Sequence, residues 1–136
     1  MRAAGRRLPL APLAAAARAA RQRAHAPYSR FKVGAAVLAD AAIHAGCNVE
    51  NASYGLTICA ERNAVAAAVL AGAKDIDALV VVSNTSPPTP PCGMCLQTLA
   101  EFGEPALPII LIGKGDERAE TTLGALLPQA FSKAFL

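Results

Sequence analysis

Two short cysteine segments constrain this 136-residue chain more than any other feature, because together they predict a metal site. Cys59 and Glu61 stand two residues apart, and Cys92 and Cys95 follow later in a Pro-Cys-x-x-Cys motif. A catalytic zinc ion takes three protein ligands and leaves a fourth position for water. Three thiolates and one carboxylate that does not bind the metal therefore suit a hydrolytic zinc site, in which Glu61 would transfer protons.

The remaining cysteine and histidines argue against a purely structural zinc site. A structural site needs a fourth Cys or His at ligand spacing. Cys47 is the only other cysteine, His25 and His44 are the only histidines, and none makes a second close pair with Cys59. A lone Cys-x-x-Cys would also suit a redox motif or a zinc ribbon, so the specificity lies in the combination.

The order Cys-x-Glu and then Pro-Cys-x-x-Cys is the signature of the zinc nucleobase deaminases in its three-cysteine form. The chain resembles the homotetrameric cytidine deaminases over nearly its whole length after the first two dozen or so residues. The segments that carry the resemblance are 26–36 (APYSRFKVGAA), 46–54 (GCNVENASY), 59–62 (CAER), 91–95 (PCGMC) and 126–131 (LLPQAF). The resemblance implies one zinc ion per chain and an α/β fold, a three-layer α-β-α sandwich around a five-stranded mixed sheet.

The resemblance also implies the reaction, which is hydrolytic deamination of cytidine and 2′-deoxycytidine to the uridine nucleosides and ammonia, in pyrimidine salvage. Zinc lowers the pKa of its water, which then attacks C4 of the cytosine ring. Glu61 would take the proton of this water, pass it to N3 and later protonate the departing ammonia. A plainer role for Glu61 is an acid that complements the dipole of a first helical turn, but three neighbouring cysteines favour catalysis.

The resemblance assigns the substrate contacts to six residues: Phe31, Asn48, Glu50, Tyr54, Ala60 and Phe131. Asn48 and Glu50 lie two apart on an extended segment, so their side chains share a face and would hold the ribose hydroxyl groups. A carboxylate there repels a phosphate, which favours a free nucleoside. Phe31 would pack on the pyrimidine, or be a core phenylalanine. Tyr54 and Phe131 would act across subunit contacts, so a tetramer would share its active sites.

One position departs from the family pattern. The family often has an arginine directly after the second cysteine of the Cys-x-x-Cys pair, where this chain has Leu96. Arg62, next to Glu61, is then the remaining cation that could neutralise a zinc thiolate. We expect Arg62→Ala to weaken zinc retention or activity more here than in a relative that has both arginines.

A length of 136 residues predicts one domain, 1–136, in which residues 1–9 are a candidate for disorder. Two strands followed by alternating helices and strands indicate a layered α/β fold. Helices are expected over 10–24, 59–71, 92–102 and 123–127, and strands over 32–39, 42–47, 78–83, 107–112 and 120–123. The turn between the first two strands, Asp40-Ala41, lacks the glycine that favours a tight hairpin.

Charge is uneven, since eight basic residues and no acidic one precede Asp40. A nucleic-acid patch and an Arg-rich transit peptide before Leu10 are open interpretations. We favour a solvated helix face, because the basic residues are not interleaved with aromatic ones as in a single-strand binder. The sequence contains no run of eighteen apolar residues, so no membrane span is predicted. Free metal-binding thiols favour the cytoplasm.

Three alternatives to the nucleoside enzyme follow from these patterns. One is a deaminase of another cytosine-containing small molecule, such as a nucleoside antibiotic. The second is a nucleic-acid cytosine editor, which only the basic N-terminus supports. The third is a zinc-stabilised binding module without catalysis, for which Glu61→Gln would change no activity.

Overall fold

A five-stranded mixed sheet forms the middle layer of the computed structural model, which describes residues 8–136. The sheet has the order β2-β1-β3-β4-β5, in which only the central pair β3 and β4 is parallel. The strands are β1 (Gly34–Ala39), β2 (Ala42–Cys47), β3 (Ala78–Val82), β4 (Pro108–Ile112) and β5 (Arg118–Thr122). The predicted mixed sheet of five strands is therefore confirmed.

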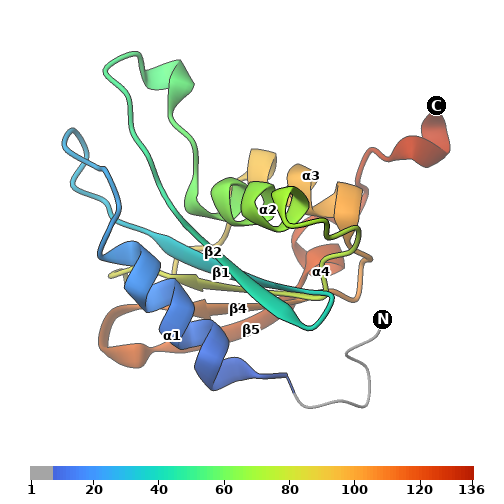
Figure 1. The fold of residues 1–136 in the computed structure, drawn as a ribbon, viewed down its shortest axis with the longest axis horizontal. Helices are drawn as coiled ribbons and strands as arrows, with labels where there is room; N and C mark the ends of the chain where they lie inside the picture. Colours follow the sequence, from blue (N-terminus) through green and yellow to red (C-terminus); the bar gives the residue numbers. More distant parts are fainter. Residues whose placement is uncertain (1–7) are drawn as a thin grey trace.

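Helices cover both faces of this sheet (Figure 1). Helix α1 (Leu10–Arg21) packs on one face, and helices α2 (Ala60–Leu70), α3 (Gly93–Phe102) and α4 (Leu123–Leu126) pack on the other. Successive residues of β1 alternate between the two sides: Ala35 and Val37 contact the core under α2 and α3, and Ala36 contacts the core under α1. Burial on both faces explains why β3 is apolar throughout. The predicted three-layer sandwich is confirmed.

The element boundaries differ from the sequence expectations where hydrogen bonds leave the regular pattern. The hairpin strand Ala42–Cys47 is confirmed, and Asp40 and Ala41 form its turn with φ values of 51° and 64°. Two positive φ values match the twist of a hairpin, although neither residue is glycine. Helix α1 ends at Arg21 rather than Ala24, because the last amides turn back by three residues, as in the bond from Ala24 N to Arg21 O (3.1 Å).

Two glycines let helices approach the sheet directly from opposite sides. A Cβ at Gly34 would lie 1.9 Å from the carbonyl oxygen of Ala17 in α1. A Cβ at Gly46 would lie 2.4 Å from the backbone nitrogen of Ala64 and 2.7 Å from the carbonyl oxygen of Ala60, both in α2. Gly46 therefore sets the depth at which the first turn of α2 sits on β2, and α2 begins directly after Cys59.

We expect Gly46→Ala to destabilise the protein by about 3 kcal/mol, at the upper end of overpacking costs, because the obstructing atoms are backbone and cannot rotate away. Urea unfolding measures this loss. Gly55→Ala is the matched control, since a Cβ at Gly55 meets nothing within 4 Å. Equal stability of the two variants would show that α2 does not depend on close contact at Gly46.

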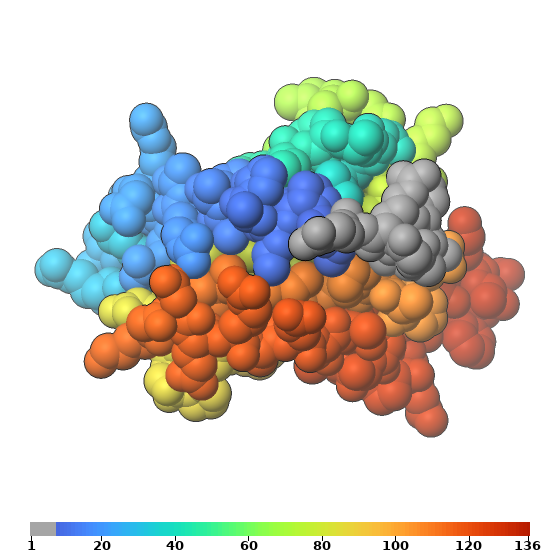
Figure 2. Space-filling view, turned by 90° about the horizontal axis from the view of Figure 1, so that it is seen from below, coloured from blue at the N-terminus to red at the C-terminus, as the bar shows by residue number. Residues whose placement is uncertain are grey.

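The N-terminal part of the described chain is tied to the body by apolar and polar contacts. Leu8 is half-buried against the core under α1, and residues 1–7, to which most of the predicted disorder and the transit peptide refer, lie outside the described residues. Arg18 pairs with Asp116 at 2.9 Å, and Arg21 donates from Nε to the carbonyl oxygen of Lys32 at 2.9 Å. Figure 2 shows this side of the molecule, with α1 in blue lying beside the orange C-terminal strands. These two arginines therefore have partners within the chain.

Among residues 8–136, no helix combines the length and the apolar character that crossing a membrane requires.

Candidate metal and substrate site

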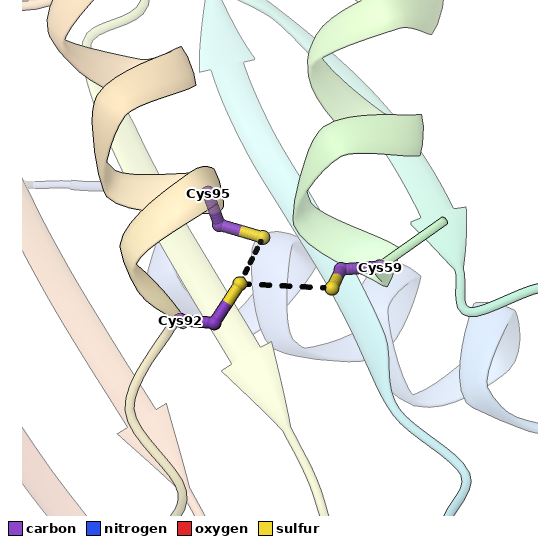
Figure 3. A group of neighbouring side chains, drawn as sticks. All are labelled: Cys59, Cys92 and Cys95. Carbon is purple, nitrogen blue, oxygen red and sulfur yellow. Dashed lines mark hydrogen bonds between the residues drawn. The ribbon is translucent and has the colours of Figure 1, made fainter. Parts of the chain in front are cut away.

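Three cysteine sulfurs converge between the first turns of α2 and α3 (Figure 3). The Sγ atom of Cys92 lies 3.8 Å from that of Cys59 and 3.4 Å from that of Cys95, and all three atoms lie within 4.8 Å of one another. Cys95 is buried, Cys59 is half-buried and Cys92 is exposed. The cluster is therefore open to solvent on the side of Cys92.

The helix caps explain how cysteines from two segments 33 residues apart reach one point. Cys59 and Cys92 are both N-cap residues with extended backbone, at ψ values of 154° and 169°, so their side chains project ahead of the helices. Cys95 follows one turn into α3 and faces the same side as Cys92. Cys59 thus lies outside the regular helical turn that contains Glu61, two residues later.

Neither cap sulfur accepts a hydrogen bond from its own helix. A Cβ at Gly93 would meet nothing within 4 Å, so the cluster leaves space there. The positive ends of the two helix dipoles remain close to the cluster and favour thiolates.

The spacing of the sulfurs fits a tetrahedral zinc ion. Zinc–sulfur bonds of about 2.3 Å at tetrahedral angles put neighbouring sulfurs about 3.8 Å apart. The two measured separations, 3.8 Å and 3.4 Å, are within about 0.4 Å of that value. Three thiolate ligands are a donor set that zinc prefers, so these residues would hold one zinc ion and leave its fourth position free.

The acidities of the thiols also point to a cation. The contact with Cys95, and then that with Arg62, lowers the pKa of Cys59 to about 5. The contact with Cys59, together with burial, raises the pKa of Cys95 above its ordinary value. Cys59 thus ionises easily, and its negative charge disfavours ionisation of Cys95, because like charges repel at this distance. A divalent cation removes that repulsion, so metal binding and thiol ionisation are coupled.

Glu61 lies in the first turn of α2, beside this cluster, and only 6% of it is exposed. Burial, and then the nearby Cys59 thiolate, raises the pKa of Glu61 to about 7. A carboxyl group with a pKa near neutrality can both accept and release a proton, which is what general acid–base catalysis needs. The group is pre-positioned next to the place where a metal-held water would react.

Arg62 is the cation closest to the sulfurs among the contacts described. Its Nη2 donates to the carbonyl oxygen of Thr57 at 3.2 Å and approaches the Sγ of Cys59 at 3.9 Å. Its Nε is buried and has no hydrogen-bond partner among the described residues. Leu96, where the family often has arginine, is buried in the core under α3 and supplies no charge. The structure thus leaves Arg62 as the cation in contact with Cys59.

We expect Arg62→Ala to speed zinc loss by roughly tenfold, because an ion-paired hydrogen bond to a partly buried thiolate disappears. Transfer of zinc to a chromogenic chelator measures this rate. Arg62→Lys is the control that keeps the charge and should recover part of the effect. The sequence-based form of the prediction adds a relative with both arginines, in which the loss should be smaller; equal losses in the two backgrounds would contradict it.

The predicted ribose segment is attached directly to the zinc site. Val49 exchanges two backbone hydrogen bonds with Ile58, at 2.9 Å and 3.0 Å, and Ile58 precedes Cys59. On the other side, the segment bonds to His25, whose N–H donates to the carbonyl oxygen of Asn48 at 3.0 Å. The bridge between Val49 and Ile58 therefore brings the predicted ribose segment and the cysteine cluster to the same end of α2.

The side chains of Asn48 and Glu50 both form hydrogen bonds with the loop that precedes β1. Asn48 is 8% exposed; its Oδ1 accepts from the N–H of Val33 at 2.9 Å, and its Nδ2 donates to the carbonyl oxygen of Phe31 at 2.7 Å. The Oε1 of Glu50 accepts from the N–H of Tyr28 at 3.0 Å and from that of Ser29 at 3.2 Å. The two polar side chains thus share a face, and they also hold the loop in place.

The other predicted substrate residues occupy different positions. Phe31 is 40% exposed, so it is not a core phenylalanine. Tyr54 is exposed on a short 3₁₀ helix, with its ring 6.0 Å from that of Tyr28. Ala60 is fully buried, backbone included, so it presents no exposed atom in this chain. Phe131 stacks on Phe135 in the C-terminal tail.

Phe131 and Tyr54 are not brought to the cysteine cluster by any contact described within this chain. The carbonyl oxygen of Phe131 accepts from Gln97 Nε2 at 2.7 Å, on the outer side of α3. Figure 1 shows the tail that carries Phe131 leaving the body beyond α3. Exposed aromatic side chains on projecting segments are suited to contact another copy of the chain.

Comparison with known proteins gives a consistent result. A model of the family described as the cytidine and deoxycytidylate deaminase zinc-binding region matches residues 11–111. The chain belongs to this family. The predicted zinc ligands, the predicted acid Glu61 and the predicted ribose segment all lie within the matched region, whereas Phe131 lies beyond it.

Relatives and solved structures cover most of the deaminase. A cytidine deaminase of Sporosarcina psychrophila is 48% identical over 122 residues, which span 89% of this chain and 90% of that protein. The crystal structure of cytidine deaminase from Burkholderia pseudomallei matches with a TM-score of 0.86 and 46% identity, covering 91% of this chain and all of that one. That of cytidine deaminase from Mycobacterium tuberculosis gives 0.79 and 41%, covering 92% and 98%.

Sequence reasoning missed one residue that contacts the predicted substrate residues, Ser29. Its hydroxyl donates to Oε2 of Glu50 and accepts from the N–H of Phe31 at 3.0 Å. The pattern Ser-x-Phe predicts a local turn bond of the serine hydroxyl, but nothing local indicates the contact with Glu50, which is 21 residues away.

Proposed function

We propose that this chain is a zinc-dependent enzyme that hydrolyses cytidine and 2′-deoxycytidine to uridine and 2′-deoxyuridine, with release of ammonia. The observation that carries the proposal is the convergence of three sulfurs beside a buried carboxyl group, Glu61, whose pKa is raised to about 7. The relatives that cover most of the chain bear the name cytidine deaminase, which supports the same substrate.

The proposed roles follow from position and charge. Zinc held by Cys59, Cys92 and Cys95 would supply a water molecule acidic enough to act as nucleophile at neutral pH. Glu61 accepts a proton from this water as the oxygen adds to C4 of the cytosine ring, and delivers it to N3. Glu61 then carries the second proton of the water to the amino group, which leaves as ammonia. Arg62 offsets the negative charge of the Cys59 thiolate throughout.

Substrate size is set by the proposed sugar contacts. Glu50 is ionised, because the hydrogen bond from Ser29 lowers the pKa of its carboxyl group. An ionised carboxylate accepts hydrogen bonds from sugar hydroxyl groups and repels a phosphate, so we propose a free nucleoside as substrate. Asn48 would share the sugar hydroxyl groups, Phe31 would pack on the pyrimidine, and Ala60 would lie beside the substrate, next to the proposed ligand Cys59.

We also propose a homotetramer with shared active sites, located in the cytoplasm. Tyr54 and Phe131 are exposed and project from the body, which supports a role in the site of a neighbouring copy. The reduced thiols that a zinc site needs support a reducing compartment. Size-exclusion chromatography with light scattering tests the assembly, and a fully active monomer would contradict it.

The deciding experiment is the loss of ultraviolet absorbance of the cytosine ring in zinc-loaded protein, with zinc content measured on the same samples. Cytidine and 2′-deoxycytidine are expected to be consumed, whereas cytidine 5′-monophosphate and an oligodeoxycytidine strand are not. Turnover of the strand but not of cytidine would favour the nucleic-acid editor. Turnover of none, by protein that contains zinc, would contradict the proposed substrate and favour a different cytosine-containing molecule.

A further inference from the structure

The position of Phe31 is set by its backbone rather than by packing of its ring. The side chain is 40% exposed, and the residue follows Arg30, whose φ of 63° lies in the left-handed region that non-glycine residues rarely adopt. A conformation of this kind persists only where surrounding contacts hold it. The orientation of the ring therefore depends on the hydrogen bonds that fix the loop.

Two side chains hold the two backbone polar groups of Phe31. Its N–H donates to the hydroxyl of Ser29 at 3.0 Å, and its carbonyl oxygen accepts from Asn48 Nδ2 at 2.7 Å. Of these two, Asn48 is already assigned to the sugar. Ser29 has no assigned role, yet it occupies the amide side of the residue that would pack on the base.

The hydroxyl of Ser29 has a second partner, which distinguishes it from an ordinary turn serine. It donates its proton to Oε2 of Glu50 while it accepts from Phe31, and the N–H of Ser29 donates to Oε1 of the same carboxylate at 3.2 Å. Because a hydroxyl has one proton, this arrangement uses it for Glu50 and leaves a lone pair for Phe31. Both carboxylate oxygens of Glu50 are thereby oriented by one residue.

The same two residues line a pocket. Ser29 and Glu50 form one side of a pocket of about 260 Å³, together with Tyr28, Tyr54 and Thr57. The bonded carboxylate is therefore accessible to a ligand from the pocket side.

We infer that Ser29 is a positioning residue that fixes Glu50, which would bind the sugar, and Phe31, which would pack on the base, in one arrangement. This inference rests on the proposed function and adds to it a residue that determines substrate recognition. Loss of the hydroxyl removes the donor to Oε2 of Glu50, so that only the amides of Tyr28 and Ser29 still hold the carboxylate, through Oε1. It also removes the acceptor of the Phe31 amide. The chemistry of the reaction at Glu61 is not touched.

Three variants test this role in zinc-loaded protein: Ser29→Ala removes the hydroxyl, Ser29→Thr keeps it, and Ser86→Ala is the matched control. Ser86 also donates from its hydroxyl to a glutamate, Oε1 of Glu117 at 2.6 Å, on an exposed loop. Steady-state kinetics are measured with cytidine and with 2′,3′-dideoxycytidine, which lacks the two hydroxyl groups that Glu50 and Asn48 would hold.

Ser29→Ala is expected to raise KM for cytidine about tenfold, with kcat changed less than about threefold, because a hydrogen bond to a charged group is lost from ground-state binding. The rise should be smaller for 2′,3′-dideoxycytidine, Ser29→Thr should restore most of the affinity, and Ser86→Ala should behave as wild type. The effects of coupled residues are not additive. A Ser29→Ala/Glu50→Gln double variant should therefore have an affinity for cytidine within about twofold of that of Glu50→Gln alone.

A binding measurement gives a second readout without turnover. Cytidine is titrated calorimetrically into zinc-loaded Glu61→Gln and into the same protein with Ser29→Ala, where the dissociation constant should rise by the same factor of about ten. Three outcomes would overturn the inference while the proposed function stands. They are a wild-type KM in Ser29→Ala, an equal rise in KM for both nucleosides, and a failure of Ser29→Thr to restore the affinity. Wild-type protein that neither binds nor deaminates cytidine would overturn both.

Discussion

Replacing Glu61 by glutamine is expected to lower kcat on cytidine by at least 10²–10⁴-fold, roughly the range that a positioned acid–base group contributes, while zinc stays bound. Glutamine has nearly the same shape but cannot carry a proton between water, N3 and the amino group. Glu61 is buried and does not belong to the sulfur cluster, so the metal site should be intact. The absorbance assay measures kcat, and zinc analysis confirms occupancy.

The same variant should change the pH dependence of stability in metal-free protein. The folded pKa of Glu61 is about 7, against an ordinary value of 4.5, so its contribution to stability is fully present below pH 4.5 and is lost as the pH rises through about 7. The loss by pH 8 is about 3 kcal/mol, because each pKa unit corresponds to about 1.4 kcal/mol. Glu61→Gln should therefore unfold at higher urea concentration than wild type at pH 8, and the difference should shrink at pH 5.

The control for this variant is Glu101→Gln, which makes the same change at an exposed position of α3. It should leave kcat and the pH dependence of unfolding unchanged. A Glu61→Gln protein that is folded, contains zinc and deaminates at the wild-type rate would refute the proposed mechanism and leave the zinc-stabilised binding module as the better interpretation.

Replacing Cys95 by alanine should remove both the metal and the activity. Cys95 is fully buried, and its Sγ lies 3.4 Å from that of Cys92. Water therefore has no access to that position to replace the missing sulfur as a ligand. Two cysteines cannot complete the three-ligand set, and we expect less than about one tenth of a zinc ion per chain and a fall of at least about 10³-fold in kcat/KM. Zinc analysis after dialysis and the absorbance assay measure these losses.

Cys47→Ala is the matched control, because Cys47 is the one cysteine outside the cluster. It should retain one zinc ion per chain. Since zinc binds only the folded state, Cys95→Ala should also lose the increase in melting temperature that added zinc gives wild type. Full zinc content and wild-type turnover in Cys95→Ala would mean that the three-cysteine site is wrong.

The elements that were predicted well are those whose hydrogen bonds and burial repeat along the chain. Strand β2 occupies the predicted residues 42–47, because it is the hairpin partner of β1. Strand β3 lies within the predicted 78–83, because a strand buried on both faces has an apolar pattern that is visible locally. Strand β1 begins at Gly34 and not at Lys32, because the amide of Val33 bonds to the side chain of Asn48 and not to a neighbouring strand. That exception depends on a contact across 15 residues.

The metal site was predictable for a related reason. Its ligands are set by two local motifs, and each motif stands at the start of a helix, so the cap geometry carries the sulfurs to the helix ends. Glu61 follows from the same motif. The surroundings of the predicted substrate residues were less predictable, because the hydrogen bonds from Asn48 to Phe31 and from Ser29 to Glu50 span 17 and 21 residues.

The sequence by itself determined the layered α/β architecture, the identity of the three sulfur ligands and the acid beside them, because spacing, capping and apolar periodicity are local properties. Only the tertiary structure decided that Gly46 lets α2 lie against β2, that Arg62 approaches Cys59, and that Ser29 connects Glu50 with Phe31. Those contacts join segments that become neighbours only when the sheet and helices pack. The order of residues alone does not give the distances between residues that are far apart in the sequence.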